Sequence, residues 1–408
     1  MKLAIVGSGI AGLGSAYALS EKYDIKLFEK NKIFGGHSNT VNICIDNKEI
    51  PVDTGFIVYN TENYPNLTAF FDHLKVPSKW SDMSFGFSSG NGSLEYSGRS
   101  LNALFAQRRN LLNLDFINGL RDILRFNREV PIAIDSGNLL DKSLGDFLIE
   151  YKFGNWFKEN FVLPMGGAIW SMPPAEILSF PAANFMSFFR NHGLLSGLSQ
   201  APRWRTVEGG SKVYVDKIIK KLGAAAISSC KVTSIERVSN GVNLLFSNGQ
   251  AENFDQVVIA SNAPQAMKLL CNKTAKEINT LSKFKTSENK VILHTDDRLM
   301  PKRLKAWSSW NFMSPGKVGD LRRASSVTYW MNRLQNIQST KQIFVSLNPL
   351  FEPTQSNNYG EFHYAHPIFD GQTFKAQKEI DEIQGHGGIW YAGAWLGYGF
   401  HEDGLTAG

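Results

Sequence analysis

Three glycines near the N-terminus have the spacing of a turn that binds a dinucleotide. Gly7, Gly9 and Gly12 directly follow Leu3–Val6, an apolar run typical of a buried parallel strand. In such a turn the first glycine permits the bend, the second lets the backbone approach a pyrophosphate, and the third lets the next helix pack on the strand. The first N–H groups of that helix then point at the anion. The residues expected to contact the pyrophosphate are Gly7, Gly9, Ile10, Ala11 and Gly12.

A second apolar run supplies the acidic residue that this turn requires. Ile25–Phe28 ends on Glu29, about 20 residues beyond the glycines, where a carboxylate accepts hydrogen bonds from ribose hydroxyls. We expect Glu29 and the adjacent Lys30 to lie at the ribose. A signal peptide would be the alternative for an apolar start, but only Lys2 precedes the run and no small-residue cleavage site interrupts it.

The composition predicts a large globular protein with an anionic partner. The chain has 408 residues, 43% of them hydrophobic, and a formal net charge of +6 without a lysine and arginine block of the nucleic-acid type. This excess suits a phosphorylated cofactor or a lipid headgroup, and we expect no nucleic-acid partner. The three cysteines lack zinc-type spacing and indicate a reducing compartment, and His363-x-x-His366 lacks a third ligand, so no metal site is expected.

The segment after Glu29 resembles the flavoprotein amine oxidase and phytoene-desaturase superfamily. The resemblance is carried by Glu29, the pair Gly35-Gly36 and the step Asp53-x-Gly55, although His37 stands where the superfamily usually has an arginine. It implies noncovalent FAD, with the flavin among His37–Thr40, Gly55-Phe56 and the C-terminal motif. The contact residues that it implies in this segment are Gly35, Gly36, His37, Ser38, Asn39, Thr40, Gly55 and Phe56.

The same resemblance predicts an α/β fold in which a Rossmann-type FAD-binding domain carries an inserted mixed α+β substrate domain. The FAD domain would comprise residues 1–58, 206–266 and 386–408, and the substrate domain residues 59–205 and 267–385. In the second FAD segment, the backbone of Val232 would contact the adenosine half, and Asn262 follows a buried strand at a ligand-binding edge. Within the insertion, the glycines and prolines of Pro164–Pro173 predict a break in the helices, as a pocket wall or a tight turn.

The C-terminal stretch resembles the flavin motif of the superfamily, in which a helix start faces the isoalloxazine ring. We expect this helix to begin near Asp403; because so short a helix is unstable alone, we also expect that the sequence lacks its natural C-terminus. The motif residues expected at the flavin are Gly393, Ala394, Glu402, Asp403, Gly404 and Leu405.

A narrower resemblance covers essentially the whole chain. Strings such as Gly35–Val41, Val52–Asn60, Ala306–Asn311 and Gly399–Gly404 are similar to bacterial NAD/FAD-binding oxidoreductases encoded beside cyclopropane-fatty-acid-synthase-like methyltransferases. This implies hydride removal from an allylic or methyl-branched carbon of a fatty acyl chain, as in the desaturation that leads to furan fatty acids. The substrate would then be a fatty acyl group, carried on a phospholipid, and a lipid methyltransferase would be a partner.

The base for this reaction is left open among four side chains, and two other functions remain as alternatives. The candidate bases are His294, Asp296, His401 and Glu402. The first alternative is amine oxidation, for which Lys290 lies on a strand where the superfamily often holds a water with a lysine. The second is a flavoprotein that assists the methyltransferase without turnover, because Ala394 stands where relatives often carry a polar residue.

A basic, leucine-rich stretch predicts contact with a membrane surface. Residues 99–128 alternate arginines with leucines and phenylalanines, so the arginines could meet anionic headgroups while the apolar stripe enters the acyl boundary. The competing interpretation is that the stripe packs on the protein core and the arginines are only solvated. We expect a cytoplasmic protein that docks peripherally through this stretch.

Overall fold

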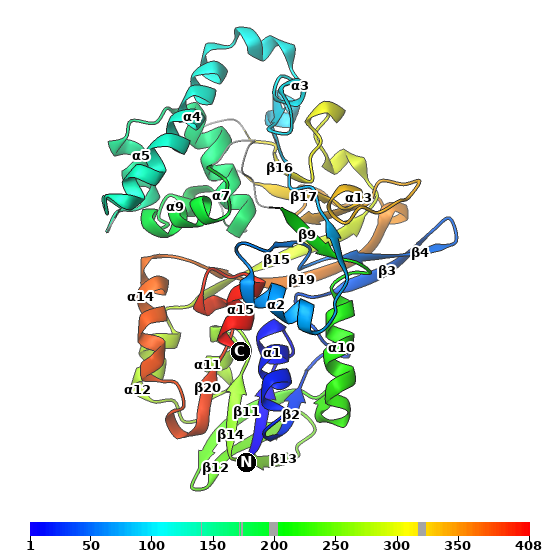
Figure 1. The fold of residues 1–408 in the computed structure, drawn as a ribbon, viewed down its shortest axis with the longest axis vertical. Coiled ribbons are helices and arrows are strands. Elements are labelled where there is room, and N and C mark those ends of the chain that lie inside the picture. The colour runs from blue at the N-terminus through cyan, green and yellow to red at the C-terminus, as the bar shows by residue number, and fades with distance from the viewer. Residues whose placement is uncertain (140, 171, 173, 196–202, 317–323) are drawn as a thin grey trace.

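The computed structural model describes residues 1–139, 141–170, 172, 174–195, 203–316 and 324–408. A parallel sheet forms one half of the molecule, a larger mixed sheet crosses its middle, and a layer of helices lies beside the mixed sheet (Figure 1). The predicted α/β fold class is confirmed. Within the described ranges, no helix combines the length and apolar composition that a membrane crossing needs.

The parallel sheet is built from strands that lie far apart in the sequence. Its order is β10 (Ala226–Ile227), β2 (Asp24–Phe28), β1 (Lys2–Val6), β14 (Gln256–Ile259) and β20 (Ile389–Tyr391). Side chains of β1 alternate between two cores: Leu3 and Ile5 pack towards α1 (Ile10–Leu19) and α10 (Lys212–Leu222), whereas Ala4 and Val6 pack on the other face. Burial of both faces explains why these strands are continuous apolar runs.

The second face of this sheet is covered by a small antiparallel sheet and by short helices. The antiparallel sheet contains β11 (Val232–Val238), β12 (Gly241–Phe246) and β13 (Ala251–Phe254), and the helices include α11 (Ala263–Leu269), α12 (Ala275–Leu281) and α14 (Gly371–Glu379). Leu281 and Ala376 share one core cluster with Ile389 of β20. The domain boundaries stay a prediction, but α12 and α14, which we assigned to the substrate domain, pack against the parallel sheet.

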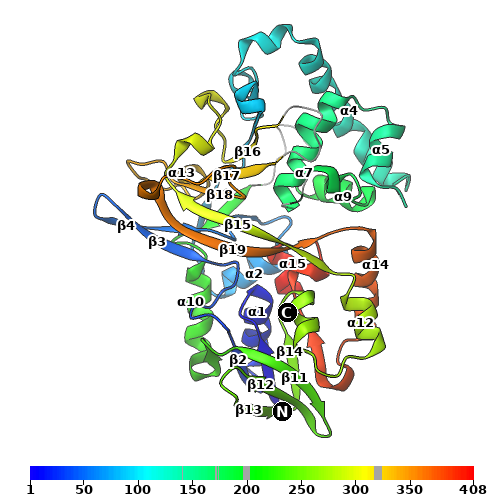
Figure 2. The same cartoon turned by 180° about the vertical axis from the view of Figure 1, so that it is seen from behind.

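The mixed sheet has seven strands and is dominated by one long antiparallel pair. Its order is β19 (Asn358–Ile368), β15 (Lys285–His294), β18 (Phe344–Leu347), β17 (Ser326–Trp330), β16 (Trp310–Ser314), β7 (Phe85–Ser89) and β8 (Leu94–Ser97). Figures 1 and 2 show β15 and β19 running side by side above the half of the molecule that contains the parallel sheet, which we call the FAD half. Smaller elements join the halves: β3 (Thr40–Ile45), β4 (Lys48–Asp53), β5 (Tyr59–Asn60), β6 (Ser78–Trp80), β9 (Trp204–Val207), α2 (Pro65–His73), α13 (Met331–Leu334) and α15 (His401–Ala407).

The helical layer has a core made mainly of phenylalanine rings. It contains α4 (Leu114–Asp135), α5 (Leu144–Glu150), α7 (Leu163–Trp170) and α9 (Ala182–Asn191). The helix break predicted for Pro164–Pro173 does not occur at Pro164, which lies in α7 directly after the π-helical turn Lys158–Val162. α7 ends at Trp170, and residues 171 and 173 lie outside the described residues. Gly166 is in this helix for close packing: a Cβ there would lie 2.9 Å from Phe185 and from Ile177.

Candidate functional site

The carboxyl ends of the parallel strands bring the predicted cofactor loops to one edge. Gly7 N donates to Phe28 O at 2.9 Å, which joins the ends of β1 and β2. Ala392 N donates to Ile259 O at 3.1 Å, which joins the ends of β20 and β14. A Cβ on Gly7 would lie 2.6 Å from Ala260 O, so β1 and β14 also touch here. Ligands bind at this edge in such sheets.

The start of α1 has the geometry of an anion site. Gly9 supplies no side-chain cap, and the first helical hydrogen bond runs from Leu13 N to Gly9 O at 2.9 Å. The N–H groups of Ile10, Ala11 and Gly12 therefore receive no acceptor from the described residues and remain for a ligand. A Cβ on Gly9 would meet no atom within 4 Å, so the backbone here is open to approach.

Glu29 lies beside this turn with its carboxylate held by the protein. Ser8 donates to Oε2 through Oγ at 2.6 Å and through its backbone N at 3.2 Å, and Asn31 N donates to Oε1 at 2.8 Å. These donors fix the carboxylate and leave lone pairs for the ribose hydroxyls that we expect there. Val232 begins β11 close by, since Cys230 N donates to Glu29 O at 2.8 Å. Lys30 is exposed at the surface next to Glu29.

The Gly35-Gly36 loop closes over the same turn. Gly35 N lies 3.1 Å from Ser8 O, and a Cβ on Gly36 would lie 3.0 Å from Gly9 Cα. Both glycines have a positive φ, of 119° and 59°, which favours glycine. The chain then passes Gly55, where a Cβ would overlap His37 O, and Phe56 N donates to His37 O at 2.7 Å. The three predicted glycine segments are thus packed backbone to backbone.

A cluster of histidine and aromatic rings follows these loops. His401 stacks on Phe56 with ring centroids 3.7 Å apart, and its Nε2 lies 2.8 Å from Ser38 Oγ. The Ser38 hydroxyl also hydrogen-bonds to the Tyr214 hydroxyl. Burial holds the pKa of His401 well below its usual value, so the imidazole is neutral at neutral pH.

A second stack lies on the mixed sheet. His37 lies 4.9 Å from the Tyr364 ring and 5.4 Å from the His366 ring, and His366 Nδ1 lies 3.3 Å from Asn289 Nδ2. Burial lowers the pKa of His37 to about 4 and that of His366 to about 3. Both rings are therefore uncharged at neutral pH. We call His37, Ser38, Phe56, Tyr214, Tyr364, His366 and His401 the histidine cluster.

Asn39 and Thr40 serve the scaffold instead of pointing into open space. Asn39 Nδ2 donates to Thr54 Oγ1 and to the Tyr364 hydroxyl, both at 3.0 Å. Thr40 Oγ1 donates to Asp53 Oδ1 at 2.6 Å. Asp53 is buried and also accepts hydrogen bonds from Ser211 and Gln335. Burial nevertheless raises the pKa of Asp53 to about 6.

The C-terminal motif crosses α1, and its two acids bind backbone groups. α15 begins at His401, two residues before the predicted start, and a Cβ on Gly404 would lie 2.7 Å from Ile10 Cγ2. Glu402 accepts hydrogen bonds from Asn66 N at 2.9 Å and Leu67 N at 2.8 Å, which caps α2. Asp403 accepts from Phe400 N at 2.8 Å, although burial raises its pKa to about 6.

The remaining motif residues lie around the same crossing. Leu405 packs against Gly14 of α1, and Ala394 packs against Gly404, with Gly393 immediately before it. Asn262 caps α11 by accepting from Gln265 N at 2.9 Å. Its side chain is thus used in the scaffold, while its backbone lies at the strand edge.

Two of the predicted bases lie elsewhere in the molecule. His294 is seven positions along β15 from Ser287, the pairing partner of His366, which corresponds to about 23 Å of strand. Its ring nitrogens are both satisfied, by Ser346 Oγ at 2.8 Å and by Asp296 N at 3.1 Å. Asp296 forms an ion pair with Arg298. Neither side chain lies in the histidine cluster, because only one end of β15 reaches it.

The Lys290 side chain also points away from the histidine cluster. Its Nζ forms ion pairs with Glu352 at 2.8 Å and Glu361 at 3.0 Å on the outer face of β15. Since side chains alternate along a strand, Asn289 takes the inward position, where it is buried next to His366. Of the five predicted catalytic side chains, only His401 is part of the histidine cluster, while Glu402 next to it caps α2.

Sequence reasoning gave no role to several members of this site. Ser8, Tyr214, Asn289 and Tyr364 carry no motif that marks them. Only Ser8 had a usable signal, because it lies between two motif glycines. His366 belonged to a histidine pair considered for a metal, and in the described residues no group of three or more metal-ligating side chains converges.

Comparison with known proteins defines the class. A family model described as flavin containing amine oxidoreductase matches residues 10–342. The chain belongs to this family, and the open turn at Gly9 and the satisfied Glu29 fit its FAD cofactor.

Particular relatives share the fold at low identity. AofH of Mycobacterium tuberculosis, a proposed flavin-containing monoamine oxidase, is 24% identical over 258 residues, which is 61% of this chain and 54% of that protein. The chain thus spans about half the length of this relative. Solved structures with the same fold include cyclohexylamine oxidase from Brevibacterium oxydans (14% identity, TM-score 0.71, 100% of this chain and 96% of that one). Another is a CLA-producing fatty acid isomerase from P. acnes (14% identity, TM-score 0.68, 99% and 96%).

Proposed function

We propose that this protein is an FAD-dependent oxidoreductase that removes a hydride from an allylic or methyl-branched carbon of a fatty acyl chain. The apolar wall beside the histidine cluster carries this proposal. Phe400, next to His401, stacks on Phe188 with centroids 5.1 Å apart, and Phe188 belongs to the phenylalanine core of the helical layer. The ring centroids of His192 and Phe188 lie 3.7 Å apart, and burial lowers the pKa of His192 to about 4. A long apolar substrate suits such a surface.

The hydrogen bonds of the carboxylates beside the site favour a substrate whose reacting group is uncharged. A cationic amine needs a free acid to replace its water shell. Asp53, Glu402 and Asp403 each accept hydrogen bonds from backbone N–H groups or neighbouring side chains. None of these three is placed as a free counter-ion, which favours an acyl chain over a diamine.

When bound, FAD supplies the oxidant that accepts the hydride equivalent. A protein group must take the second hydrogen as a proton, and His401 is our candidate because it is the one predicted catalytic side chain that lies in the histidine cluster, where its imidazole is neutral. The hydroxyls of Ser38 and Tyr214 lie on the His401 Nε2 side, at 2.8 and 3.4 Å, and can hold the ring in one orientation. The phenylalanine wall would exclude water from the reacting carbon.

Amine oxidation is the second candidate, favoured by the family match and by the name of AofH. The outward position of Lys290 removes the one lysine that the sequence offered for this chemistry. The methyltransferase partnership is also a proposal, as an assembly in which this chain supplies a flavin without turnover.

Anaerobic flavin reduction separates the three functions. The holoenzyme is mixed without oxygen with methyl-branched unsaturated phospholipid in detergent, or with putrescine or benzylamine, and the main flavin absorbance band is followed. We expect bleaching by the phospholipid only, slowed at least tenfold in His401→Gln, with Lys290→Met as the matched control at wild-type rate. Bleaching by amines alone contradicts the proposal. Bleaching by neither, with stable copurification of a lipid methyltransferase, would favour the assisting role.

A further inference from the structure

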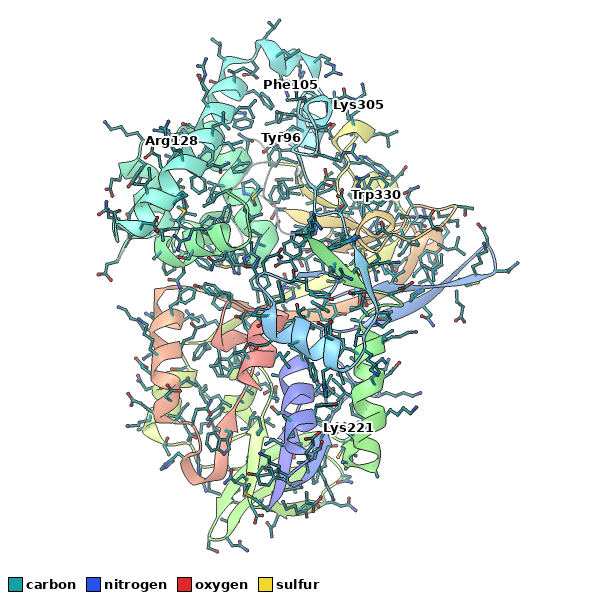
Figure 3. All side chains as sticks on the ribbon, viewed as in Figure 1. Tyr96, Phe105, Arg128, Lys221, Lys305 and Trp330 are labelled. Carbon is teal, nitrogen blue, oxygen red and sulfur yellow. The ribbon has the colours of Figure 1, made fainter. Side chains whose placement is uncertain are left out.

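One end of the molecule combines exposed leucines with basic side chains. Four segments gather there: α3 (Leu101–Leu104), the 3-10 turns η2 (Arg108–Leu112) and η6 (Leu304–Ala306), and the start of α4. Figures 1 and 2 show this end farthest from the N-terminus, and Figure 3 labels Phe105 and Lys305 there. We call it the basic leucine tip; its members are Leu101, Leu112, Leu114, Leu304, Arg108, Arg109, Lys302 and Lys305.

The leucine side chains of the tip are highly exposed to solvent. Leu112 is 90% exposed, Leu114 77%, Leu101 76% and Leu304 72%. Single exposed leucines need no explanation, but several on adjoining segments mark an interaction surface. Farther along α4 the apolar side chains are divided: Phe116, Phe126 and Val130 are fully buried, whereas Leu124 is 70% exposed and Ile132 59%. The predicted stripe therefore packs inward through its phenylalanines, and its exposed leucines gather at the tip, with Leu124 as a further exposed leucine on α4.

A basic cavity opens next to these leucines. It is a shallow depression that is largely open to solvent, with a volume of about 570 Å³, and it is lined by Gly90, Asn91, Gly92, Ser93, Arg109, Lys302 and Arg303. Its floor is fixed by Glu95, a buried carboxylate that accepts from Lys302 N at 2.7 Å and from the Arg303 guanidinium at 2.8 Å. Gln107 braces the opposite wall by donating to Gly92 O and Ser93 O, both at 3.1 Å.

The positive charge of the tip is largely uncompensated. Arg303 is neutralised by Glu95, but in the described part of the chain Arg108, Arg109, Lys302 and Lys305 form no ion pair, and Asp115 is the exposed acid of these segments. Arg109 donates to Ser93 O and Arg108 to Phe105 O, so both heads are held at the surface. Apolar side chains beside fixed cations complement an anionic bilayer surface better than they complement a neutral one.

We propose that the basic leucine tip docks on anionic phospholipid membranes. The leucines enter the acyl boundary, the four basic side chains meet lipid phosphates, and the cavity receives one headgroup. This keeps the first part of the predicted stretch 99–128 and adds Lys302, Leu304 and Lys305 from outside it. Arg125 is excluded, because its guanidinium donates to Tyr151 O at 2.9 Å, pairs with Asp122 and lies 4.2 Å from the Phe153 ring centroid. The docking proposal does not depend on the proposed reaction.

Vesicle cosedimentation of the holoenzyme tests this surface. We expect binding to vesicles with one third phosphatidylglycerol at low salt, weakening with added sodium chloride, and none to pure phosphatidylcholine. Each basic residue near such a surface contributes roughly fivefold in affinity, so replacing Arg108, Arg109, Lys302 and Lys305 by Ser should weaken binding by at least 100-fold. Leu112→Ser with Leu114→Ser should weaken it at least tenfold.

The control variant carries Lys22→Ser, Lys32→Ser, Lys217→Ser and Lys220→Ser, which removes the same charge from the FAD half. Flavin absorbance and melting temperature report that each variant is folded. The proposal is overturned if the wild-type protein does not bind anionic vesicles. It is also overturned if the vesicle affinity of the tip variant is within threefold of wild type, or if the control substitutions lower that affinity as much as the tip substitutions do. Because no turnover is measured, these outcomes are independent of the substrate.

Discussion

The substitution Gly9→Ala, which adds one methyl group, tests whether the turn after β1 binds the pyrophosphate of FAD. Gly9 has φ −65° and ψ 178°, which alanine adopts without strain, and a Cβ there meets no atom of the protein within 4 Å. The fold should tolerate the change, at a cost of about 0.5–1 kcal/mol for a poorer helix cap. The new methyl group occupies the space through which a pyrophosphate reaches the N–H groups of Ile10 and Ala11.

The expected loss is in FAD affinity. Two charge-assisted hydrogen bonds at about 1.5 kcal/mol each amount to about 3 kcal/mol, or on the order of 100-fold in Kd. Deflavinated protein is titrated with FAD and followed by flavin fluorescence, and its melting temperature is measured without FAD. Where flavin removal unfolds the chain, the rate of FAD release from holoenzyme replaces the titration.

Gly14→Ala is the matched control in the same helix. Its Cβ would lie 2.7 Å from Leu405 Cδ1, the end of a flexible side chain, and it lies away from the pyrophosphate. We expect near-normal FAD affinity for this variant. If Gly9→Ala binds FAD within threefold of wild type, the pyrophosphate does not lie on this turn and the reasoning fails.

Three further outcomes follow from the charges around the site. The pKa of Asp53 in the folded protein, about 6, lies above its ordinary value of 3.8. Relative to Asp53→Asn, wild type should therefore lose about 3 kcal/mol of its free energy of unfolding as the pH rises from about 4 to 6. Urea unfolding of both proteins at several pH values measures this loss, and the same pH dependence in both would contradict the prediction. Glu402→Gln should lower the free energy of unfolding by about 1–3 kcal/mol, because an N–H group of α2 loses its acceptor, but should slow flavin reduction less than tenfold; a 100-fold loss would make Glu402 the base. Lys290→Met should leave the rate of flavin reduction within twofold, and a tenfold loss would restore the lysine role.

The parts of the site that could be predicted from sequence are those fixed by short-range geometry. Gly7 has to be a glycine because its φ is 105°, Gly12 because a Cβ there would overlap Gly7 O of the same turn, and Glu29 follows its strand directly. Such constraints are visible in a few neighbouring residues.

The histidine cluster could not be predicted in this way, because it depends on register and long-range pairing. Whether position 289 or 290 of β15 faces the site is decided by a shift of one residue, which no local pattern specifies. His366 reaches His37 only because β19 pairs with β15 in that register. Glu402 is a candidate base by residue type, yet the approach of α2 to α15 makes it a helix cap.

The replacement of an arginine by His37 bears on how the cofactor charge is balanced. An arginine would bring a permanent positive charge to the loop that covers Gly9. His37 brings none at neutral pH, because burial between Tyr364 and its other neighbours lowers its pKa to about 4. With the pyrophosphate on this turn, as we predict, the backbone N–H groups at the start of α1 would carry more of the interaction than they would beside an arginine. This is why a single methyl group on Gly9, which removes access to those groups, is expected to have so large an effect on FAD binding.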